Sequence, residues 1–126
     1  MPDVPTPPAR ILIVDDQPVF RCAARMLLEA RGFAVAGEAD CAAGALDAAA
    51  RLAPDGVLLD VCLGEQSGVD VARALTRAHP ALAVVLVSSD ELHGCPQRLR
   101  ESGACAFLLK SRLVATDLSA FWRVTS

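Results

Sequence analysis

The sequence predicts a doubly wound α/β domain built on a five-stranded parallel sheet. Five short apolar segments lack the alternation of half-exposed strands, which is typical of strands buried on both faces of a parallel sheet. The stretches between them are long enough for the crossover helices that parallel strands require. With 126 residues, 53% hydrophobic and 21% charged, the chain suits one globular domain. The predicted strands cover residues 11–14, 33–37, 56–59, 83–87 and 106–109.

Start and stop signals place a helix after each predicted strand. Pro18 suits the first turn of the first helix, and Asp40 is a natural N-cap for the second. Ser67 and Asp70 form a capping box at the start of the third. A glycine and a proline interrupt the fourth stretch, so a regular helix is expected there only from about Pro96. The expected helices cover residues 18–31, 41–52, 68–79, a stretch from 96 onward, and part of 113–124.

The helical period predicts an apolar face for four of these helices, and that of the third holds Val69, Ala72 and Leu75. The first helix has five apolar residues on one face, the second should bury mostly alanines with two leucines, and the last has one apolar stripe. In chain order, these sets are Val19, Ala23, Met26, Leu27 and Ala30; then Leu46 and Leu52; then Val114, Leu118, Phe121 and Trp122.

Charge and composition argue against several classes of protein. The net charge of −3 and the pI of about 5.2 disfavour a nucleic-acid-binding surface. Residues 1–10 hold four prolines and are expected to form a flexible N-terminal arm, unlike a signal peptide. The apolar run 81–87 is too short to cross a bilayer. We expect a cytoplasmic protein with one domain over residues 11–126, no output domain and no membrane partner.

The cysteines number five, an odd count, and show neither zinc-ligand nor CxxC spacing. All are expected to be free, and the four other than Cys62 are expected to be small buried hydrophobic residues. A redox sensor at Cys62 is disfavoured, since nothing beside it in the sequence lowers the pKa of its thiol. The other four are Cys22, Cys41, Cys95 and Cys105.

Chemically active side chains follow four of the five predicted strands. They are Asp15 and Asp16 after the first, Asp60 after the third, Ser88 after the fourth and Lys110 after the fifth. The carboxyl ends of parallel strands meet at one edge, so these side chains should converge. Any one of them could be a cap or a solvated charge, but capping does not explain the whole set. Adjacent carboxylates repel each other, and a bound cation relieves that repulsion.

Four segments around these residues resemble the receiver domain of bacterial response regulators, the CheY-like phosphoaccepting half of two-component signalling systems. They are "VDD" (14–16), "LLDVCLGEQSG" (58–68), "VLVSS" (85–89) and "GACAFLLKS" (103–111). The separations between the second acid, the third acid, the hydroxyl and the lysine are close to those usual in the family. The resemblance runs from Ile11 to about Val124 and implies the flavodoxin-like receiver topology.

The resemblance also implies roles for the acids and the lysine. Asp60 resembles the phosphoacceptor, Asp16 a side-chain ligand of Mg²⁺, and Asp15 a residue that helps hold the ion through water. Cys62 would offer its backbone carbonyl to the ion, and Lys110 would contact the phosphoryl group. The chemistry is consistent, because a carboxylate can attack phosphorus and a site with few carboxylates suits Mg²⁺ better than Ca²⁺.

Further positions resemble the family's switch and lifetime-tuning residues. Ser88 resembles the switch hydroxyl and Phe107 the switch aromatic. Cys62 and Asp90 would flank the acceptor and set the lifetime of the phosphoryl group. Because a thiol orients water poorly, slow self-dephosphorylation is expected.

Two positions depart from the family pattern. Gly64 stands where a proline is frequent, so the loop after the third strand is expected to be looser, although glycine also forms turns well. Ser111 follows Lys110 where the family often has a proline on a cis bond, so this peptide has no need to be cis.

The leading hypothesis is a stand-alone phosphorylation switch. It would receive phosphate from a sensor histidine kinase or phosphotransfer protein, with Mg²⁺ as cofactor, and would present a changed surface to a downstream protein. It would be no enzyme in the usual sense, although it would assist its own phosphorylation and dephosphorylation. A homodimer stays open, and direct binding to nucleic acid is not expected.

Two alternatives belong to other classes. A pseudo-receiver would keep the fold as a phosphorylation-independent protein-binding module, and the irregular stretch before residue 96 keeps this alternative open. A flavin-binding electron carrier shares the fold, but it would need a Ser/Thr/Gly-rich phosphate loop after the first strand. The stretch DDQPVF (15–20) has the opposite charge.

Overall fold

The computed structural model describes residues 7–89 and 96–124 and contains the expected parallel sheet. The strand order is β2-β1-β3-β6-β7, and all neighbouring strands are parallel. This confirms the doubly wound α/β fold. A short antiparallel hairpin, β4–β5, was not predicted. The strands are β1 (Arg10–Val14), β2 (Ala34–Ala39), β3 (Gly56–Asp60), β4 (Cys62–Leu63), β5 (Gln66–Ser67), β6 (Ala83–Ser88) and β7 (Ala106–Leu109).

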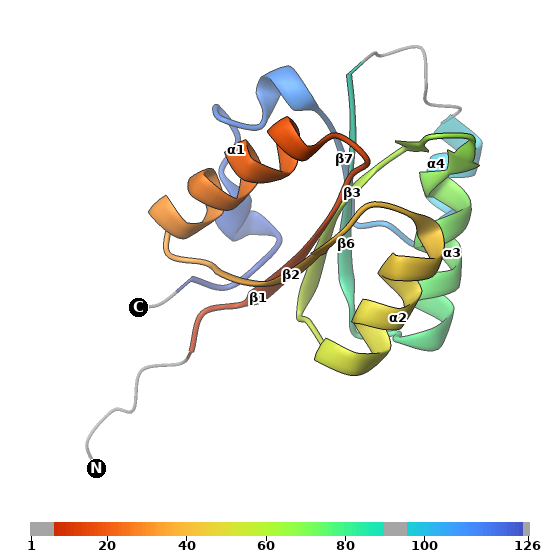
Figure 1. The fold of residues 1–126 in the computed structure, drawn as a ribbon, viewed down its shortest axis with the longest axis horizontal. Coiled ribbons are helices and arrows are strands. Elements are labelled where there is room, and N and C mark those ends of the chain that lie inside the picture. Colours follow the sequence, from red (N-terminus) through yellow and green to blue (C-terminus); the bar gives the residue numbers. More distant parts are fainter. Residues whose placement is uncertain (1–6, 90–95, 125–126) are drawn as a thin grey trace.

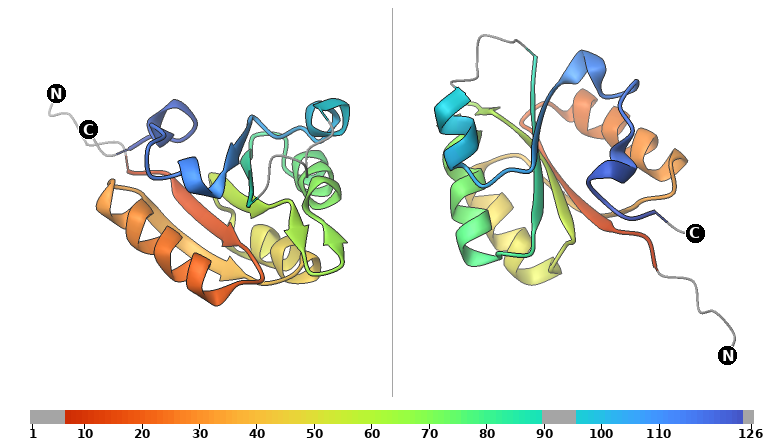
Figure 2. Two further views of the ribbon diagram at one scale, coloured as in Figure 1. Left: turned by 90° about the horizontal axis from the view of Figure 1, so that it is seen from above. Right: turned by 180° about the vertical axis from the view of Figure 1, so that it is seen from behind.

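Helices cover both faces of the sheet (Figures 1 and 2). Helix α1 (Pro18–Ala30) and the C-terminal segment lie on one face, and the other three helices lie on the opposite face. The fourth helix begins at the predicted Pro96. All helices among the described residues are too short or too polar to span a bilayer. The three helices of the second face are α2 (Ala42–Leu52), α3 (Gly68–Ala78) and α4 (Pro96–Glu101).

Apolar side chains fill both sides of the sheet. The central strands β1, β3 and β6 are almost fully buried, whereas β2 and β7 are half-buried because each forms an edge with one neighbouring strand. Burial on both faces was therefore predicted correctly for three strands and wrongly for two. The buried polar or charged side chains of the described residues gather where strands end, at Asp15, Asp60 and Ser88, with Ser102 elsewhere.

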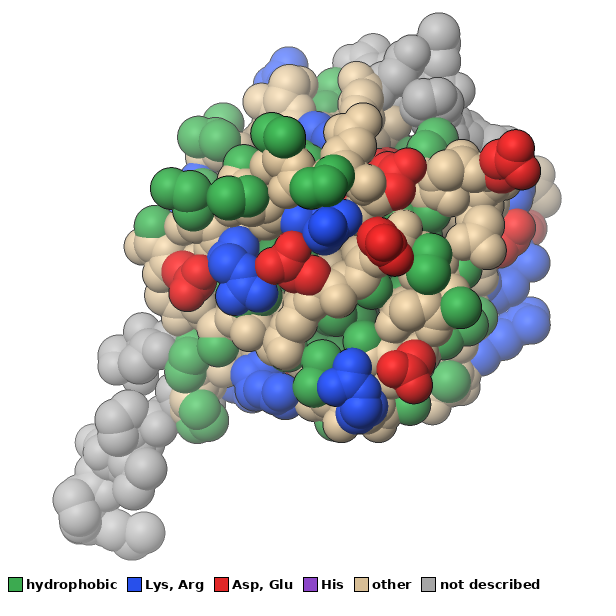
Figure 3. Space-filling view, viewed as in Figure 1, with side chains coloured by type: hydrophobic (Ala, Val, Ile, Leu, Met, Phe, Trp, Pro, Cys, Tyr) green, Lys and Arg blue, Asp and Glu red, His purple; other side chains and the backbone are tan. Residues whose placement is uncertain are grey.

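The predicted apolar face of α1 does not face the sheet. Val19 is 83% exposed and Met26 is 67% exposed, while Ala24 and Leu28 are buried. Hydrophobic side chains consequently gather on the outer side of α1 (Figure 3). Apolar residues occupy most of the circumference of this helix, so the period alone did not determine which side packs. Leu46 of α2, also predicted to be buried, is 38% exposed.

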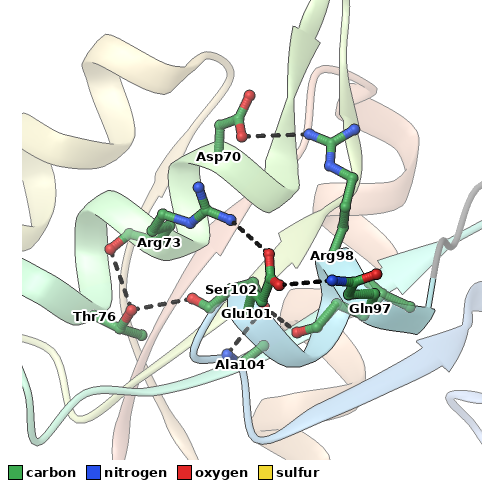
Figure 4. Close-up of polar contacts among 9 residues, drawn as sticks. Asp70, Arg73, Thr76, Gln97, Arg98, Glu101, Ser102 and Ala104 are labelled. Atoms are coloured by element: carbon green, nitrogen blue, oxygen red, sulfur yellow. Dashed lines mark hydrogen bonds and ion pairs between the residues drawn. The ribbon is translucent and has the colours of Figure 1, made fainter.

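Two predicted helix caps differ from the structure, the first in its residue and the second in its hydrogen bonds. The N-cap of α2 is Cys41, not Asp40, and its sulfur accepts a backbone N–H from the first turn. Ser67 does occupy the N-cap of α3, but its side chain makes no capping hydrogen bond. Asp70 instead forms an ion pair with Arg98 of α4 at 3.4 Å (Figure 4). The capping box is replaced by a contact between two helices.

The predicted helix within residues 113–124 does not form. Local side-chain bonds compete with helical ones: the Thr116 hydroxyl donates to the Arg112 carbonyl at 2.7 Å, and Asp117 caps the following turn. The guanidinium of Arg31 donates to the carbonyls of Val114 and Thr116, which a helix would use internally. The helical element that this segment contains is one 3-10 turn, Leu118–Ala120, and a second 3-10 turn, Lys110–Arg112, precedes the segment.

The C-terminal segment nevertheless completes the core. Leu118 and Trp122 are buried as predicted, whereas Val114 is 71% exposed. The indole N–H of Trp122 donates to the carbonyl of Ala83 at 3.0 Å, and its ring packs edge-on against Phe33 with centroids 5.9 Å apart. Trp122 thus anchors the segment without a helix.

The two ends of the described part of the chain meet at the start of β1. Ala9 is buried, and its N–H donates to the carbonyl of Arg123 at 2.9 Å. Ala9 and Arg10 therefore belong to the folded domain, and residues 1–6 of the expected arm lie outside the described residues.

The described cysteines are free, as predicted, but they are not buried. Cys22 and Cys105 are exposed, because the first lies on the outer side of α1 and the second precedes an edge strand. Cys41 is half-buried. Cys95 lies outside the described residues.

Replacing Trp122 should test the role of the C-terminal segment. Trp122→Ala should lower the free energy of unfolding by about 3–5 kcal/mol, because it removes a buried aromatic side chain and leaves a cavity. The matched control is Val114→Ala in the same segment, which should change it by less than about 0.5 kcal/mol because the side chain is exposed. Urea unfolding followed by far-UV circular dichroism measures both. Equal effects would contradict this role.

Candidate functional site

The sheet brings the predicted acids and lysine to one edge. Asp15 follows β1, Asp60 ends β3, and Lys110 follows β7. Carboxylate oxygens of Asp15, Asp16 and Asp60 lie within 4.8 Å of one another. Asp15 and Asp60 are buried and Asp16 is exposed, so the cluster opens to solvent on the side of Asp16. The convergence follows from the parallel strand order.

Lys110 lies between two of the three carboxylates. Its Nζ is 2.7 Å from Asp15 Oδ2 and 3.0 Å from Asp60 Oδ2, and it lies 4.2 Å from the centre of the Phe20 ring. Burial alone would lower the pKa of Lys110, but hydrogen bonds to Asp15 and Asp60 and their negative charges raise it. The ammonium therefore stays charged at neutral pH.

Asp15 is the most deeply buried acid of the cluster. Burial raises the pKa of Asp15 and the charge of Asp60 adds to this increase, while Lys110 and the N–H of Gln17, 2.8 Å away, oppose it. Arg21 donates to the Asp15 carbonyl at 2.6 Å. The cluster holds three carboxylates and one ammonium, so its excess negative charge favours an additional cation.

Backbone N–H groups of the β4–β5 hairpin hold the other two acids. The N–H of Cys62 donates to Asp60 Oδ1 at 3.0 Å. The N–H of Gly64 donates to Asp16 Oδ2 at 3.1 Å. The loop was expected to be looser with glycine in place of proline, but it forms a paired hairpin bonded to the site.

The first residue of α3 packs against the backbone of Asp60. A Cβ atom at Gly68 would lie 1.9 Å from the Asp60 carbonyl oxygen, so only glycine fits there. The Gly68 N–H donates to the carbonyl of Val61 at 2.7 Å. This close approach fixes the backbone at the end of β3.

Sequence reasoning missed four contributors to the site. Gly68 stands inside a segment already singled out, and a glycine at the first position of the predicted helix was the available signal. The contacts of Gln17, Phe20 and Arg21 depend on the angle between α1 and β1, for which the sequence carries no signal.

Ser88 and Phe107 lie on the same face of adjacent strands. Ser88 is fully buried at the end of β6, opposite Leu109, and Phe107 lies opposite Leu86. Side chains alternate along a strand, so both point toward the face that α3 and α4 cover. Phe107 is half-buried, and a hollow of about 180 Å³ lies beside it between α4 and β7. This placement is compatible with the switch roles that the resemblance implies for Ser88 and Phe107. Asp90 lies outside the described residues.

Cys62 is exposed at the mouth of the cluster. Partial desolvation of the sulfur raises the pKa of the Cys62 thiol, and the charges of Asp60 and Asp16 add to this effect. The thiolate, which is the reactive form, is thus disfavoured. This agrees with the expectation that Cys62 is not a redox sensor. The described peptide bonds include Lys110–Ser111, and none of them is cis.

Comparison with known families identifies the kind of domain. The family described as response regulator receiver domain matches residues 11–117. Response regulator GacA of Pseudomonas aeruginosa is 37% identical over 102 residues, which cover 80% of this chain and 48% of that protein. The virulence factors putative positive transcription regulator BvgA of Bordetella pertussis is 34% identical over 101 residues, with the same coverages. The chain spans about half the length of these curated relatives.

Comparison with solved structures indicates the same family. The signal receiver domain of the putative response regulator NarL from Mycobacterium tuberculosis superposes with a TM-score of 0.74 and 32% identity, over 85% of this chain and 87% of that one. A response regulator protein from Burkholderia pseudomallei, with a phosphorylated aspartic acid, calcium ion and citrate, gives a TM-score of 0.78 and 25% identity, over 90% and 66%. A chain with this sheet order, this charged edge and this sequence similarity belongs to the response regulator receiver domain family.

Proposed function

We propose that Asp60 accepts a phosphoryl group from a sensor histidine kinase or phosphotransfer protein and thereby switches a protein-binding surface. The observation that carries this proposal is the buried contact of 3.0 Å between Asp60 Oδ2 and Lys110 Nζ, beside two further carboxylates. A positively charged group fixed next to a nucleophilic carboxylate suits the transfer of an anionic group.

The cluster fits a divalent cation of the Mg²⁺ type. Its donors are carboxylate oxygens, the ligands that Mg²⁺ prefers, and one lysine neutralises only part of their charge. Asp16 and Asp60 would hold the ion by their side chains, Asp15 through water and Cys62 by its carbonyl. When bound, the ion would supply positive charge to the phosphoryl oxygens. The relative from Burkholderia pseudomallei, solved with a calcium ion and a phosphorylated aspartic acid, supports a divalent site.

The transfer itself is an in-line displacement at phosphorus. An Asp60 oxygen attacks the phosphorus of a phosphohistidine, the phosphorus–nitrogen bond breaks, and the imidazole leaves with the bonding electrons. The product on the protein is an acyl phosphate. Lys110 lies where it can contact the new phosphoryl group, and the buried Ser88 would be drawn toward it. Phe107 would then move into space near Ser88, changing the surface at α4 and β7.

The outer side of α1 supports docking of a helical partner next to the site. Val19, Cys22 and Met26 are exposed at helical spacing, and α1 begins two residues after Asp16. An apolar stripe of this kind fits the groove of a helix bundle. The stripe lies beside the charged edge, so a docked partner would bring its phosphohistidine close to Asp60.

The output we propose is binding to a separate downstream protein and not to DNA. The net charge of −3 supports this, because DNA-binding surfaces are usually basic. The pseudo-receiver alternative is disfavoured because every position that the chemistry needs is filled and the acids and lysine converge.

Phosphorylation by a small donor tests the acceptor and the metal residue. With phosphoramidate and Mg²⁺, the wild-type protein should gain the mass of one phosphoryl group, measured by intact-protein mass spectrometry. Asp60→Asn should gain none because the nucleophile is lost. Asp16→Ala should also gain none, while its circular dichroism spectrum stays unchanged because Asp16 is exposed. Normal labelling of Asp16→Ala would refute the metal assignment.

Substitutions on α1 should separate partner docking from chemistry. The double variant Val19→Ser/Met26→Ser should receive phosphate about tenfold more slowly from a purified kinase or phosphotransfer protein that labels the wild type, since the lost apolar contact weakens docking. Labelling by phosphoramidate should be unchanged. The control is Leu46→Ser, an exposed leucine on the opposite face, which should alter neither rate. A slower rate with both donors would contradict docking at α1.

The lifetime of the phosphoryl group should depend on Cys62. Cys62→Asn should speed self-dephosphorylation, because a carboxamide orients an attacking water better than a thiol. The measurement is the decay of labelled protein after removal of the donor, in wild type and variant. An unchanged or slower decay would show that Cys62 does not protect the phosphoryl group.

A further inference from the structure

We propose that Gly64 is a positioning residue whose backbone N–H holds Asp16 in the orientation that binds the divalent cation. The proposal rests on the proposed function, because it concerns the same metal site. It follows from one contact, the 3.1 Å hydrogen bond between the Gly64 nitrogen and Asp16 Oδ2, across 48 positions of sequence.

Asp16 needs such a restraint more than its neighbours do. Asp15 and Asp60 are buried and each contacts Lys110, whereas Asp16 is exposed beside two other carboxylates that repel it. Without a donor, its side chain would rotate toward solvent, away from the cluster. The Gly64 N–H counters this by holding one oxygen near the other acids. Mg²⁺ demands nearly ideal octahedral geometry, so an oriented ligand raises its affinity.

The hairpin that carries Gly64 is itself held in place. Gly64 is in the two-residue turn between paired strands, with Leu63 opposite Gln66. The side-chain oxygen of Gln66 accepts the Ala42 N–H at the start of α2, at 2.9 Å. On the other side, Gly68 packs against the Asp60 backbone. The donor at Gly64 is therefore anchored to both α2 and β3 and does not simply follow Asp16.

Glycine suits this geometry, and proline would abolish it. Gly64 has a φ of +61°, which proline cannot adopt, and proline has no N–H to donate. The departure from the family pattern at this position thus adds a hydrogen bond to the site. Asparagine, in contrast, keeps the N–H and tolerates positive φ. A Cβ at Gly64 meets no atom within 4 Å, so a side chain fits there.

Calorimetric titration with Mg²⁺ alone tests the proposal on the metal-free protein. Gly64→Pro should raise the dissociation constant about tenfold, the usual effect of losing a bond that orients a metal ligand. The control, Gly64→Asn, should stay within about twofold of wild type because it keeps the N–H. Unchanged affinity in Gly64→Pro, or equal weakening in both variants, would overturn the proposal.

Amide hydrogen exchange supplies a readout that does not need the proline variant to fold. In the wild type, the Gly64 amide should exchange about tenfold more slowly than in Asp16→Ala, which removes the acceptor. Equal exchange would overturn the hydrogen bond as a feature of the protein in solution. If the wild type does not bind Mg²⁺ but Gly64 is protected, the metal site of the proposed function fails, and with it the positioning role. If the wild type, Gly64→Pro and Gly64→Asn all bind Mg²⁺ with equal affinity, the positioning role alone is refuted.

Discussion

The ammonium of Lys110, held between the carboxylates of Asp15 and Asp60, is the interaction on which the site depends. Two acids are tolerated at a buried sheet edge because one fixed cation lies 2.7 and 3.0 Å from them. The fold supplies the three groups from three different strand ends, so the ion pair exists only when β1, β3 and β7 have taken their places. A third acid, Asp16, leaves the cluster with excess negative charge.

This excess negative charge destabilises the folded state locally, and the rest of the domain must offset that loss of free energy. Burial raises the pKa of Asp15, which shows that its environment disfavours the ionised form. Apolar packing on both sides of the central strands provides the compensating stability, helped by Trp122 in a segment that is not a helix. Apart from Ser102, the buried polar and charged side chains of the described residues thus lie at one edge of the sheet, where the proposed function would use them.

The sheet and the charged edge could be predicted because they depend on strong, local patterns. Apolar strands and the residues that follow them identify Asp60 and Lys110 without knowledge of packing. The last helix was predicted wrongly because Thr116 and Asp117 bond to nearby backbone, and Arg31, distant in sequence, takes carbonyls that a helix needs. The apolar face of α1 and the two-residue strands of the hairpin depend on tertiary contacts, which no period in the sequence encodes.

The charged edge and the outer side of α1 are separate surfaces, and each meets a different requirement of the proposed phosphorylation switch. In the proposed function, the chemistry at Asp60 needs charge and geometry, which backbone N–H groups, Lys110 and the divalent cation held by the acids would together supply. In the proposed function, the choice of partner depends on the exposed side of α1, which can vary because it does not pack on the sheet. Substitutions at positions such as Val19 therefore leave the core and the acids unaffected. Specificity and chemistry can change independently, although both lie at the same end of the molecule.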